Sequence, residues 1–246
     1  NMSRRALLAG SLSAPIASTV AGCATSALGT SAGLTALSPT DEAGWAKVAS
    51  YYDLKSDITN VENGYWGQMS RPVLEAYDAH IVRVNQDNSF FARREYGPEW
   101  RGIINEVSQR MGAEEGEVAL TRGATEALQN IIGGYNLLEP GDAVMMADLD
   151  YGSVIAAMRW RANQSGAEIV QLEIPEPVTH DELVAFYASA FDQHPKTRLV
   201  LLTHLSNRTG LLMPVREIAE IARERGNEVV VDAAHSWGQI DFQVPD

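Results

Sequence analysis

Residues 228–235 have the sequence EVVVDAAH, and this stretch decides the fold class. Three consecutive β-branched valines are typical of a strand that is covered on both faces, as strands are in parallel sheets. Asp232 follows them where the strand ends, at the edge where open α/β sheets bind their ligands. The stretch therefore predicts a parallel sheet with an acidic residue at a ligand-binding edge.

Upstream of this stretch, apolar runs alternate with amphipathic segments. The runs predict strands at 118–121, 143–147, 168–172, 198–203 and 228–232. The segments between them predict helices at 124–138, 153–163, 181–191 and 215–225. Such alternation indicates an α/β fold, a three-layer sandwich with a mostly parallel sheet and helices on both faces.

The composition restricts the class of protein. Of the 246 residues, 45% are hydrophobic, which is enough for a sizeable core. The formal charge is 19 − 32 = −13, and this acidic balance disfavours nucleic acid and anionic membranes as partners. A single cysteine, Cys23, excludes a disulfide framework within the chain.

The N-terminal segment has the features of an export signal. Residues 3–8, SRRALL, resemble a twin-arginine signal, and a mildly apolar run follows them. Residues 20–23, VAGC, resemble a lipobox in which Cys23 is lipidated, and the alternative is an ordinary cleavage site near residues 21–27. We expect an exported protein, periplasmic or anchored as a lipoprotein, with its translation start at Met2.

The chain is expected to have three parts. Residues 1–40 are the signal peptide and an Ala/Gly/Ser/Thr-rich linker, and residues 41–115 form an N-terminal helical arm. Within the arm, a helix is expected near Pro72 after the N-cap Ser70, and another is expected to end at Met111. Residues 116–246 form the α/β domain, and we expect the chain to be an N-terminal fragment of a longer protein.

Two turns that precede helices are candidate ligand loops. Gly123, Ala124 and Thr125 open a helix, where free backbone N–H groups and the helix dipole favour a phosphate. Tyr151 lies in the next loop and suits stacking on a flat heteroaromatic ring. Each turn also has a plain explanation. The turn at Gly123 can be a simple helix cap, and the turn at Tyr151 can be a capping turn with a packing tyrosine.

Two further loops carry polar side chains past strand ends. Asn207 can donate an amide N–H to a phenolate-type oxygen, or it can simply form the turn before Gly210. Asp232 can hold the protonated nitrogen of a pyridine ring, and His235 can reach the same ring. The plain alternatives are a helix N-cap for Asp232 and a surface histidine for His235. Together the four loops provide the contacts that pyridoxal phosphate needs.

Longer motifs extend this interpretation to a known family. The chain resembles the class V aminotransferases, fold-type I pyridoxal phosphate enzymes, and within them the isopenicillin N epimerase-like branch. The motifs that carry the resemblance are NGYWG at 63–67, ALTRGATEA at 119–127, LEPGD at 138–142, HLSNRTG at 204–210 and VDAAHS at 231–236.

The resemblance implies roles for the residues of these motifs. Ala124 and Thr125 bind the phosphate, and Tyr151 stacks on the ring where relatives often carry histidine. Asp232 pairs with the ring nitrogen, while Asn207 and His235 lie near the ring oxygen. Asp232 and His235 are the expected catalytic residues, and no metal is expected in the site.

The chain departs from the family at the Schiff-base lysine, which in the family follows the Asp strand. The three lysines here, Lys47, Lys55 and Lys196, all precede Asp232. Lys196 also precedes a strand, so it is expected at the opposite edge of the sheet. We therefore expect a fragment without the lysine and without the C-terminal small domain, inactive alone and a homodimer at full length.

Three other residues are weaker candidates for contact with an amino-acid-type substrate. They are Asn63, Tyr65 and Arg94, and a surface turn with ion pairs explains the region of Arg94 equally well. Two alternative functions are a dinucleotide-binding enzyme and an exported non-catalytic homologue. A dinucleotide-binding enzyme needs Gly-x-Gly-x-x-Gly after its first strand, which residues 123–125 lack, and an exported non-catalytic homologue would keep the fold alone.

Overall fold

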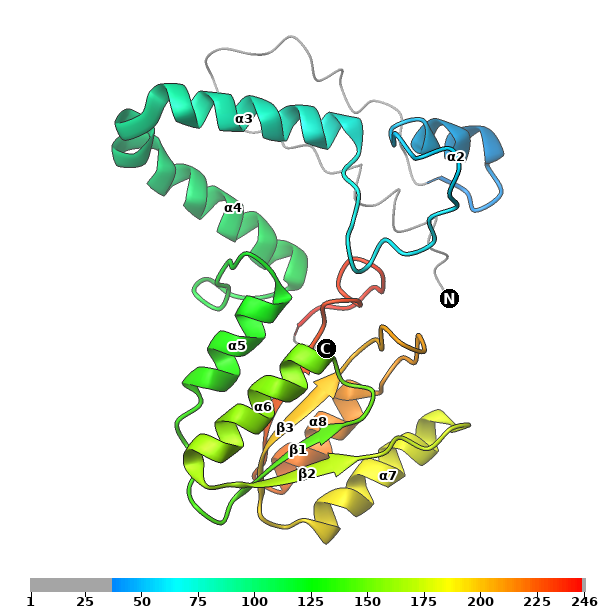
Figure 1. Ribbon diagram of the computed structural model, residues 1–246, viewed down its shortest axis with the longest axis vertical. Helices are drawn as coiled ribbons and strands as arrows, with labels where there is room; N and C mark the ends of the chain where they lie inside the picture. Colours follow the sequence, from blue (N-terminus) through cyan, green and yellow to red (C-terminus); the bar gives the residue numbers. More distant parts are fainter. Residues whose placement is uncertain (1–36, 245–246) are drawn as a thin grey trace. The chain divides into compact units, whose positions relative to one another are not determined.

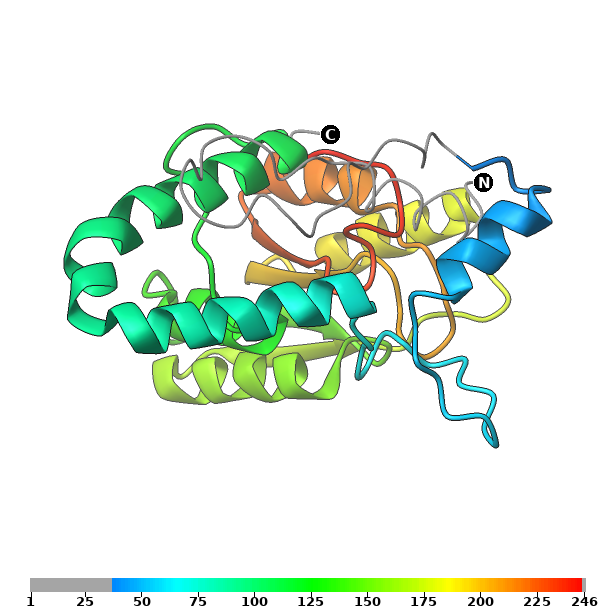
Figure 2. The same ribbon diagram turned by 90° about the horizontal axis from the view of Figure 1, so that it is seen from above.

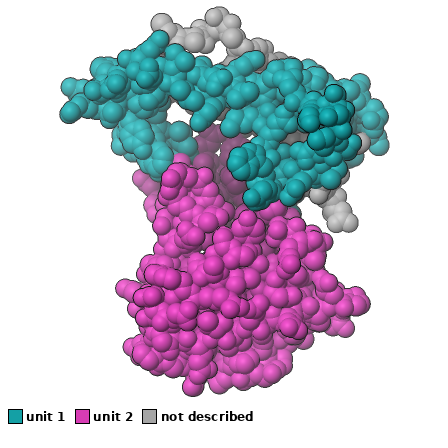
Figure 3. Space-filling view, in the orientation of Figure 1, with its two compact units in different colours: residues 1–105, 238–241 teal, residues 106–237, 242–246 magenta. Residues whose placement is uncertain are grey.

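The computed structural model describes residues 37–244. The chain divides into two compact units, which Figure 3 shows in different colours. The first comprises residues 1–105 and 238–241, and the second comprises residues 106–237 and 242–246. The export signal and Cys23 lie outside the described residues.

The second unit contains a four-stranded sheet (Figure 1). The strand order is β2-β1-β3-β4, and all three pairs of neighbours are parallel. The predicted α/β fold class is therefore confirmed, and each predicted strand that forms lies within one residue of its expected bounds. The strands are β1 (Ala143–Ala147), β2 (Glu168–Leu172), β3 (Thr197–Thr203) and β4 (Glu228–Asp232).

Helices cover both faces of this sheet, as the alternating pattern predicts. The helices α5 (Ala124–Gly134) and α6 (Gly152–Ser165) pack on one face, while α7 (His180–Gln193) and α8 (Val215–Glu224) pack on the other. Figure 2 shows α6 on one side of the strands and α7 with α8 on the opposite side.

The two inner strands supply both halves of the core. In β1, Val144 and Met146 face α5 and α6, whereas Met145 and Ala147 face α7 and α8. The four side chains are at most 1% exposed, so the strand needs apolar residues at every position. The outer strand β4 is less covered, since Val231 remains 38% exposed.

One predicted strand does not form. Residues 118–121 make no backbone ladder with any described residue, although Val118 and Leu120 are half-buried. A strand exists only where a neighbour offers its N–H and C=O groups, and an apolar run cannot supply that partner by itself. The expectation that the turn at Gly123 follows a sheet strand is therefore wrong.

The first unit is helical. Its elements are α2 (Glu42–Ala49), α3 (Arg71–Phe90), the π-helical segment η1 (Phe91–Glu95) and the start of α4 (Tyr96–Met111). Ser70 is the N-cap of α3, as predicted. Arg83 holds the corner between α3 and α4, because its Nη2 lies 2.7 Å from Glu95 Oε2 and 2.5 Å from Glu99 Oε1.

Within residues 37–244, no helix is long and apolar enough to span a membrane.

Candidate active site

The carboxyl ends of β1, β3 and β4 lie side by side at one edge of the sheet. Thr203, the last residue of β3, is the register partner of Asp232, the last residue of β4. The backbone N–H of His204 donates to the carbonyl of Asp232 at 3.0 Å. Because parallel strands end at a common edge, the loops that follow them share this edge.

Asp232 is the predicted ring-nitrogen partner, and it lies buried at this edge with only 5% of its surface exposed. Its Oδ1 accepts a hydrogen bond from the backbone N–H of Ala234 at 3.0 Å. No described Lys, Arg or His forms an ion pair with its carboxyl group. The sequence places Asp232 correctly at the strand end, and its role stays a prediction.

Asp150 is a second buried acid at the same edge, and sequence reasoning gave it no role. It is 5% exposed, and its Oδ1 accepts from Thr203 Oγ1 at 2.6 Å. Its Oδ2 accepts from the backbone N–H of Ala147 at 2.7 Å. Its only sequence signal was an acid in the loop after a buried strand.

Burial, and to a lesser extent the nearby negative charge of Asp232, raises the pKa of Asp150 to about 6. The hydrogen bonds from Ala147 and Thr203 act in the opposite direction. Two buried carboxyl groups therefore interact at one edge, and neither has a cationic partner among the described residues. Such a pair is costly unless a cation or a proton compensates it.

The other predicted residues at this edge lie in the adjoining loops. Tyr151 is the N-cap of α6, directly after Asp150, and its side chain is 36% exposed. Asn207 is exposed in the turn after β3, and Arg208 from the same turn donates to the carbonyl of Asp148 at 3.2 Å. His235 is half-buried in the turn after β4.

These placements bring Tyr151, Asn207, Asp232 and His235 to one edge of the second unit. No described hydrogen bond joins their side chains to one another. Ser206 orders the turn that carries Asn207, since its buried hydroxyl accepts from the backbone N–H of Arg208 at 3.2 Å. Side-chain and backbone contacts thus order the loops at this edge, where Tyr151 and Asn207 are exposed and Asp232 is buried.

His204 is a further residue at this edge to which sequence reasoning assigned no role. It directly follows β3, and its ring lies edge-on to Phe242 with the ring centroids 4.8 Å apart. Burial lowers the pKa of His204, which favours the neutral imidazole. Its Nδ1 is buried and has no hydrogen-bond partner among the described residues. A polar residue directly after a buried strand is the signal that could have identified it.

Gly123, Ala124 and Thr125 form the exposed start of α5. The backbone N–H groups of Ala124 and Thr125 have no described partner, and a Cβ added at Gly123 would meet no atom within 4 Å. This turn is therefore open to an anion. Glu126 folds back to accept from Arg122 N at 2.9 Å. No described hydrogen bond links the turn to the strand-end residues.

Lys196 lies at the opposite edge of the sheet, as predicted. It precedes β3, and its backbone carbonyl accepts from the N–H of Ala143, the first residue of β1, at 2.8 Å. Its Nζ lies 3.8 Å from Glu168 Oε1 at the start of β2. A five-residue strand spans roughly 17 Å, so Lys196 is remote from Asp232.

The weaker candidates Asn63, Tyr65 and Arg94 belong to the first unit. Asn63 Oδ1 accepts from the backbone N–H of Gln68 at 3.0 Å, while Tyr65 is 69% exposed. Arg94 is exposed in η1 and has no ion pair among the described residues. The structure does not test their predicted contact with a substrate.

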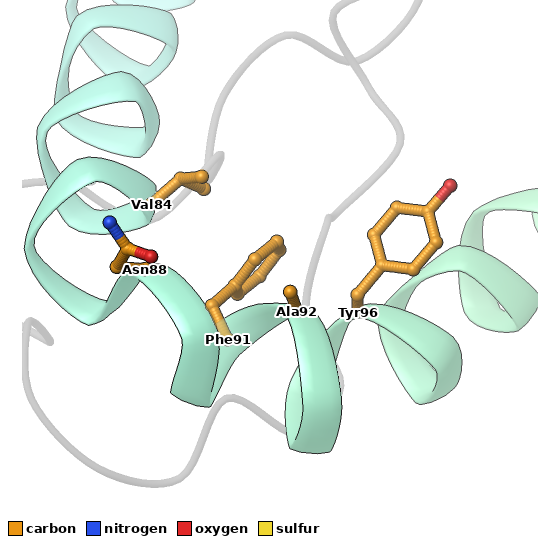
Figure 4. Close-up of a pocket in the computed structure, with 5 residues that line it drawn as sticks. All are labelled: Val84, Asn88, Phe91, Ala92 and Tyr96. Carbon is orange, nitrogen blue, oxygen red and sulfur yellow. The ribbon is translucent and has the colours of Figure 1, made fainter.

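An open hollow lies along α3, η1 and α4 (Figure 4). Its lining is mostly apolar, and Phe91 and Tyr96 form an edge-on pair with centroids 6.2 Å apart. None of the predicted cofactor-binding residues lines it.

Comparison with known proteins gives the class of this chain. A family model described as aminotransferase class-V matches residues 77–246. The chain therefore belongs to the class V aminotransferase family, whose cofactor is pyridoxal phosphate, and the resemblance found in the sequence is confirmed.

The matches to curated relatives cover only part of the length of each relative. Isopenicillin N epimerase of Streptomyces clavuligerus is 28% identical over 210 residues, which are 82% of this chain and 50% of the relative. A protein of Vibrio cholerae named as a probable cysteine desulfurase is 32% identical over 64% of this chain and 39% of the relative. The chain thus spans about half the length of the curated relatives it matches.

Solved structures share the fold. One is a variant of the enzyme C-DES with glycine covalently linked to its pyridoxal phosphate cofactor. It has a TM-score of 0.68 and 22% identity, and the match covers 77% of this chain and 50% of that one.

The residues of the second unit fit this cofactor. The buried carboxyl groups of Asp150, after β1, and Asp232, at the end of β4, have no cationic partner among the described residues, and a protonated ring nitrogen would supply one. The start of α5 offers free N–H groups and the Thr125 hydroxyl, which suit a phosphate. The exposed ring of Tyr151 suits a flat heteroaromatic partner.

Proposed function

We propose that this chain is the cofactor-binding part of a pyridoxal-phosphate-dependent enzyme that acts on an amino acid or a related amine. Aminotransferase or epimerase-like chemistry is the proposed reaction class. The observation that carries the proposal is the buried carboxyl pair of Asp232 and Asp150, which has no cationic partner among the described residues. The chain's membership of the class V family supports it.

Each predicted residue has a distinct task in this proposal. Asp232 accepts a hydrogen bond from the protonated ring nitrogen, and Tyr151 covers one face of the ring. The backbone of Gly123 and Ala124 and the hydroxyl of Thr125 bind the phosphate.

Asn207 and His235 complete the proposed site at the ring oxygen. The amide of Asn207 donates to that oxygen, and His235 lies within reach of the same side of the ring. When bound, pyridoxal phosphate acts as an electron sink for charge that develops on the substrate's Cα. Asp232 supports this by keeping the ring nitrogen protonated.

The test is the dissociation constant for pyridoxal phosphate, measured by fluorescence titration of the 246-residue chain. Asp232→Asn removes the charge and should weaken binding at least about tenfold, because charge-assisted hydrogen bonds contribute about 1.5–3 kcal/mol and 1.4 kcal/mol is tenfold. Asp142→Asn is the matched control, since Asp142 directly precedes β1 at the opposite edge. Equal losses in both variants, or no binding by the wild type, would contradict the proposal.

We further propose that the full-length protein is a homodimer. In α3, no residue is buried, and large apolar side chains such as Val73, Leu74 and Tyr77 are 53%, 45% and 53% exposed. A second copy that covers this face would remove the apolar surface from water. Light scattering after gel filtration should give a dimer mass that Leu74→Asp reduces to that of a monomer. A monomeric wild type would refute the proposal.

Export by the twin-arginine route is proposed from the sequence of residues 3–8 alone. Replacing both Arg4 and Arg5 by lysine should leave the protein in the cytoplasmic fraction, because the pathway recognises the arginine pair. Cys23→Ala tests the lipid anchor separately, by loss of the protein from the membrane fraction. A periplasmic double-lysine variant would exclude this export route.

A further inference from the structure

Asp150 joins two neighbouring strands at the proposed site. One carboxyl oxygen accepts from the backbone N–H of Ala147, the last residue of β1, and so closes the turn that follows this strand. The other accepts from the hydroxyl of Thr203, the last residue of β3, at 2.6 Å. Both hydrogen bonds are buried, so water does not compete with the protein groups that form them.

The hydrogen bond between Asp150 and Thr203 connects to two proposed cofactor contacts, one through each partner. Tyr151 follows Asp150 in the chain, and its backbone carbonyl accepts from the N–H of Val154 at 2.9 Å at the start of α6. Thr203 pairs in register with Asp232 on β4. The side-chain hydrogen bond between Asp150 and Thr203 therefore links the segment that carries Tyr151 to the strand pair that carries Asp232.

We propose that Asp150 is a positioning residue, which sets the spacing between the ring-stacking Tyr151 and the nitrogen-directed Asp232 through its hydrogen bond with Thr203. The inference rests on the proposed function, because it assigns those two side chains to one bound ring. A ring can be stacked and hydrogen-bonded at its nitrogen together only if the two contacts lie at the correct separation. Asp150 itself touches neither the ring nor the substrate in this assignment.

The test uses two substitutions of Thr203 that differ by one group. Thr203→Val keeps the shape and loses the hydroxyl, whereas Thr203→Ser keeps the hydroxyl. Amide hydrogen exchange of the cofactor-free chain reports the β1 turn at Ala147 and the β4 turn at Ala234. Titration with ring-¹⁵N-labelled pyridoxal phosphate then gives the affinity and, from the ¹⁵N chemical shift, the protonation of the ring nitrogen.

Thr203→Val should speed exchange at both amides, weaken binding by about tenfold and shift the ¹⁵N resonance towards the unprotonated ring. Thr203→Ser should match the wild type in all three, which a nonspecific loss of stability would not explain. Asp150→Ala removes both acceptor oxygens and should weaken binding as Thr203→Val does. Its urea midpoint, compared with that of the wild type, shows that the variant is folded.

Two outcomes would overturn the inference, and they are distinguishable. If the wild type binds pyridoxal phosphate and Thr203→Val binds it equally well with an unchanged ¹⁵N shift, Asp150 has no positioning role and the proposed function stands. If the wild type binds no pyridoxal phosphate, the proposed function fails and the inference fails with it.

Discussion

Asp150 carries a carboxyl group whose ionisation is opposed by burial, so its charge state links the site to the stability of the fold. The folded chain raises the pKa of Asp150 from 3.8 to about 6. Between these values the folded state holds a proton that the unfolded chain releases. The stability that Asp150 contributes is therefore greatest at low pH, falls as the pH rises through this window and stays low above it.

A comparison of the wild type with Asp150→Asn isolates this effect. The difference in unfolding free energy, wild type minus variant, should fall by up to roughly 3 kcal/mol between about pH 4 and pH 7. Urea unfolding at several pH values measures it. A difference that does not change with pH would show that Asp150 is not a buried ionisable group in the folded chain.

Burial of the Tyr187 hydroxyl lowers the stability of the fold for a different reason. It is 1% exposed on α7, its hydroxyl has no hydrogen-bond partner among the described residues, and burial raises its pKa. An unsatisfied buried hydroxyl costs about 1–3 kcal/mol, so Tyr187→Phe should raise the unfolding free energy by about 1 kcal/mol. Tyr77→Phe is the control, because Tyr77 is 53% exposed and its hydroxyl reaches water. Destabilisation by Tyr187→Phe would indicate a hidden partner, such as a buried water.

At the scale of elements, α7 begins with a capping box. The Thr179 hydroxyl accepts from the N–H of Glu182, and Glu182 Oε2 accepts from the N–H of Thr179 at 2.8 Å. Thr179→Ala removes one half of this exchange and should cost about 1 kcal/mol of unfolding free energy. Thr179→Ser keeps a hydroxyl and should cost much less. Equal urea midpoints for the two variants would show that the cap does not stabilise α7.

The strands also show where the local sequence predicts the structure correctly. Continuous apolar runs predict β1 and β3 because inner strands of a parallel sheet are covered on both faces. The valines of β4 also predict a strand correctly, although β4 is an outer strand and is covered less. The same reasoning fails at residues 118–121. Their apolar content matches that of a strand, but no described strand lies beside them to form a backbone ladder. Pairing depends on where the rest of the chain lies, and local composition carries no such information.

At the scale of the whole molecule, the distribution of lysines makes a further prediction. No lysine follows Asp232, and Lys196 lies at the opposite edge of the sheet. The 246-residue chain should therefore bind pyridoxal phosphate without a covalent bond, and borohydride should fix no adduct. Mass spectrometry of the reduced and digested chain measures this. An adduct at Lys196 would contradict the proposed site, because it would place the cofactor at the edge of the sheet opposite Asp232.

By itself, the sequence determined the fold class, the placement of Asp232 at a strand end and the family. These follow from patterns that are local, since hydrophobic period and strand-end polarity lie within a few residues of one another. Only the tertiary structure decided that Asp150, Thr203 and Asp232 form one buried group. Asp150 and Thr203 are 53 positions apart, and the register of β1, β3 and β4, which no single segment encodes, brings these three residues together.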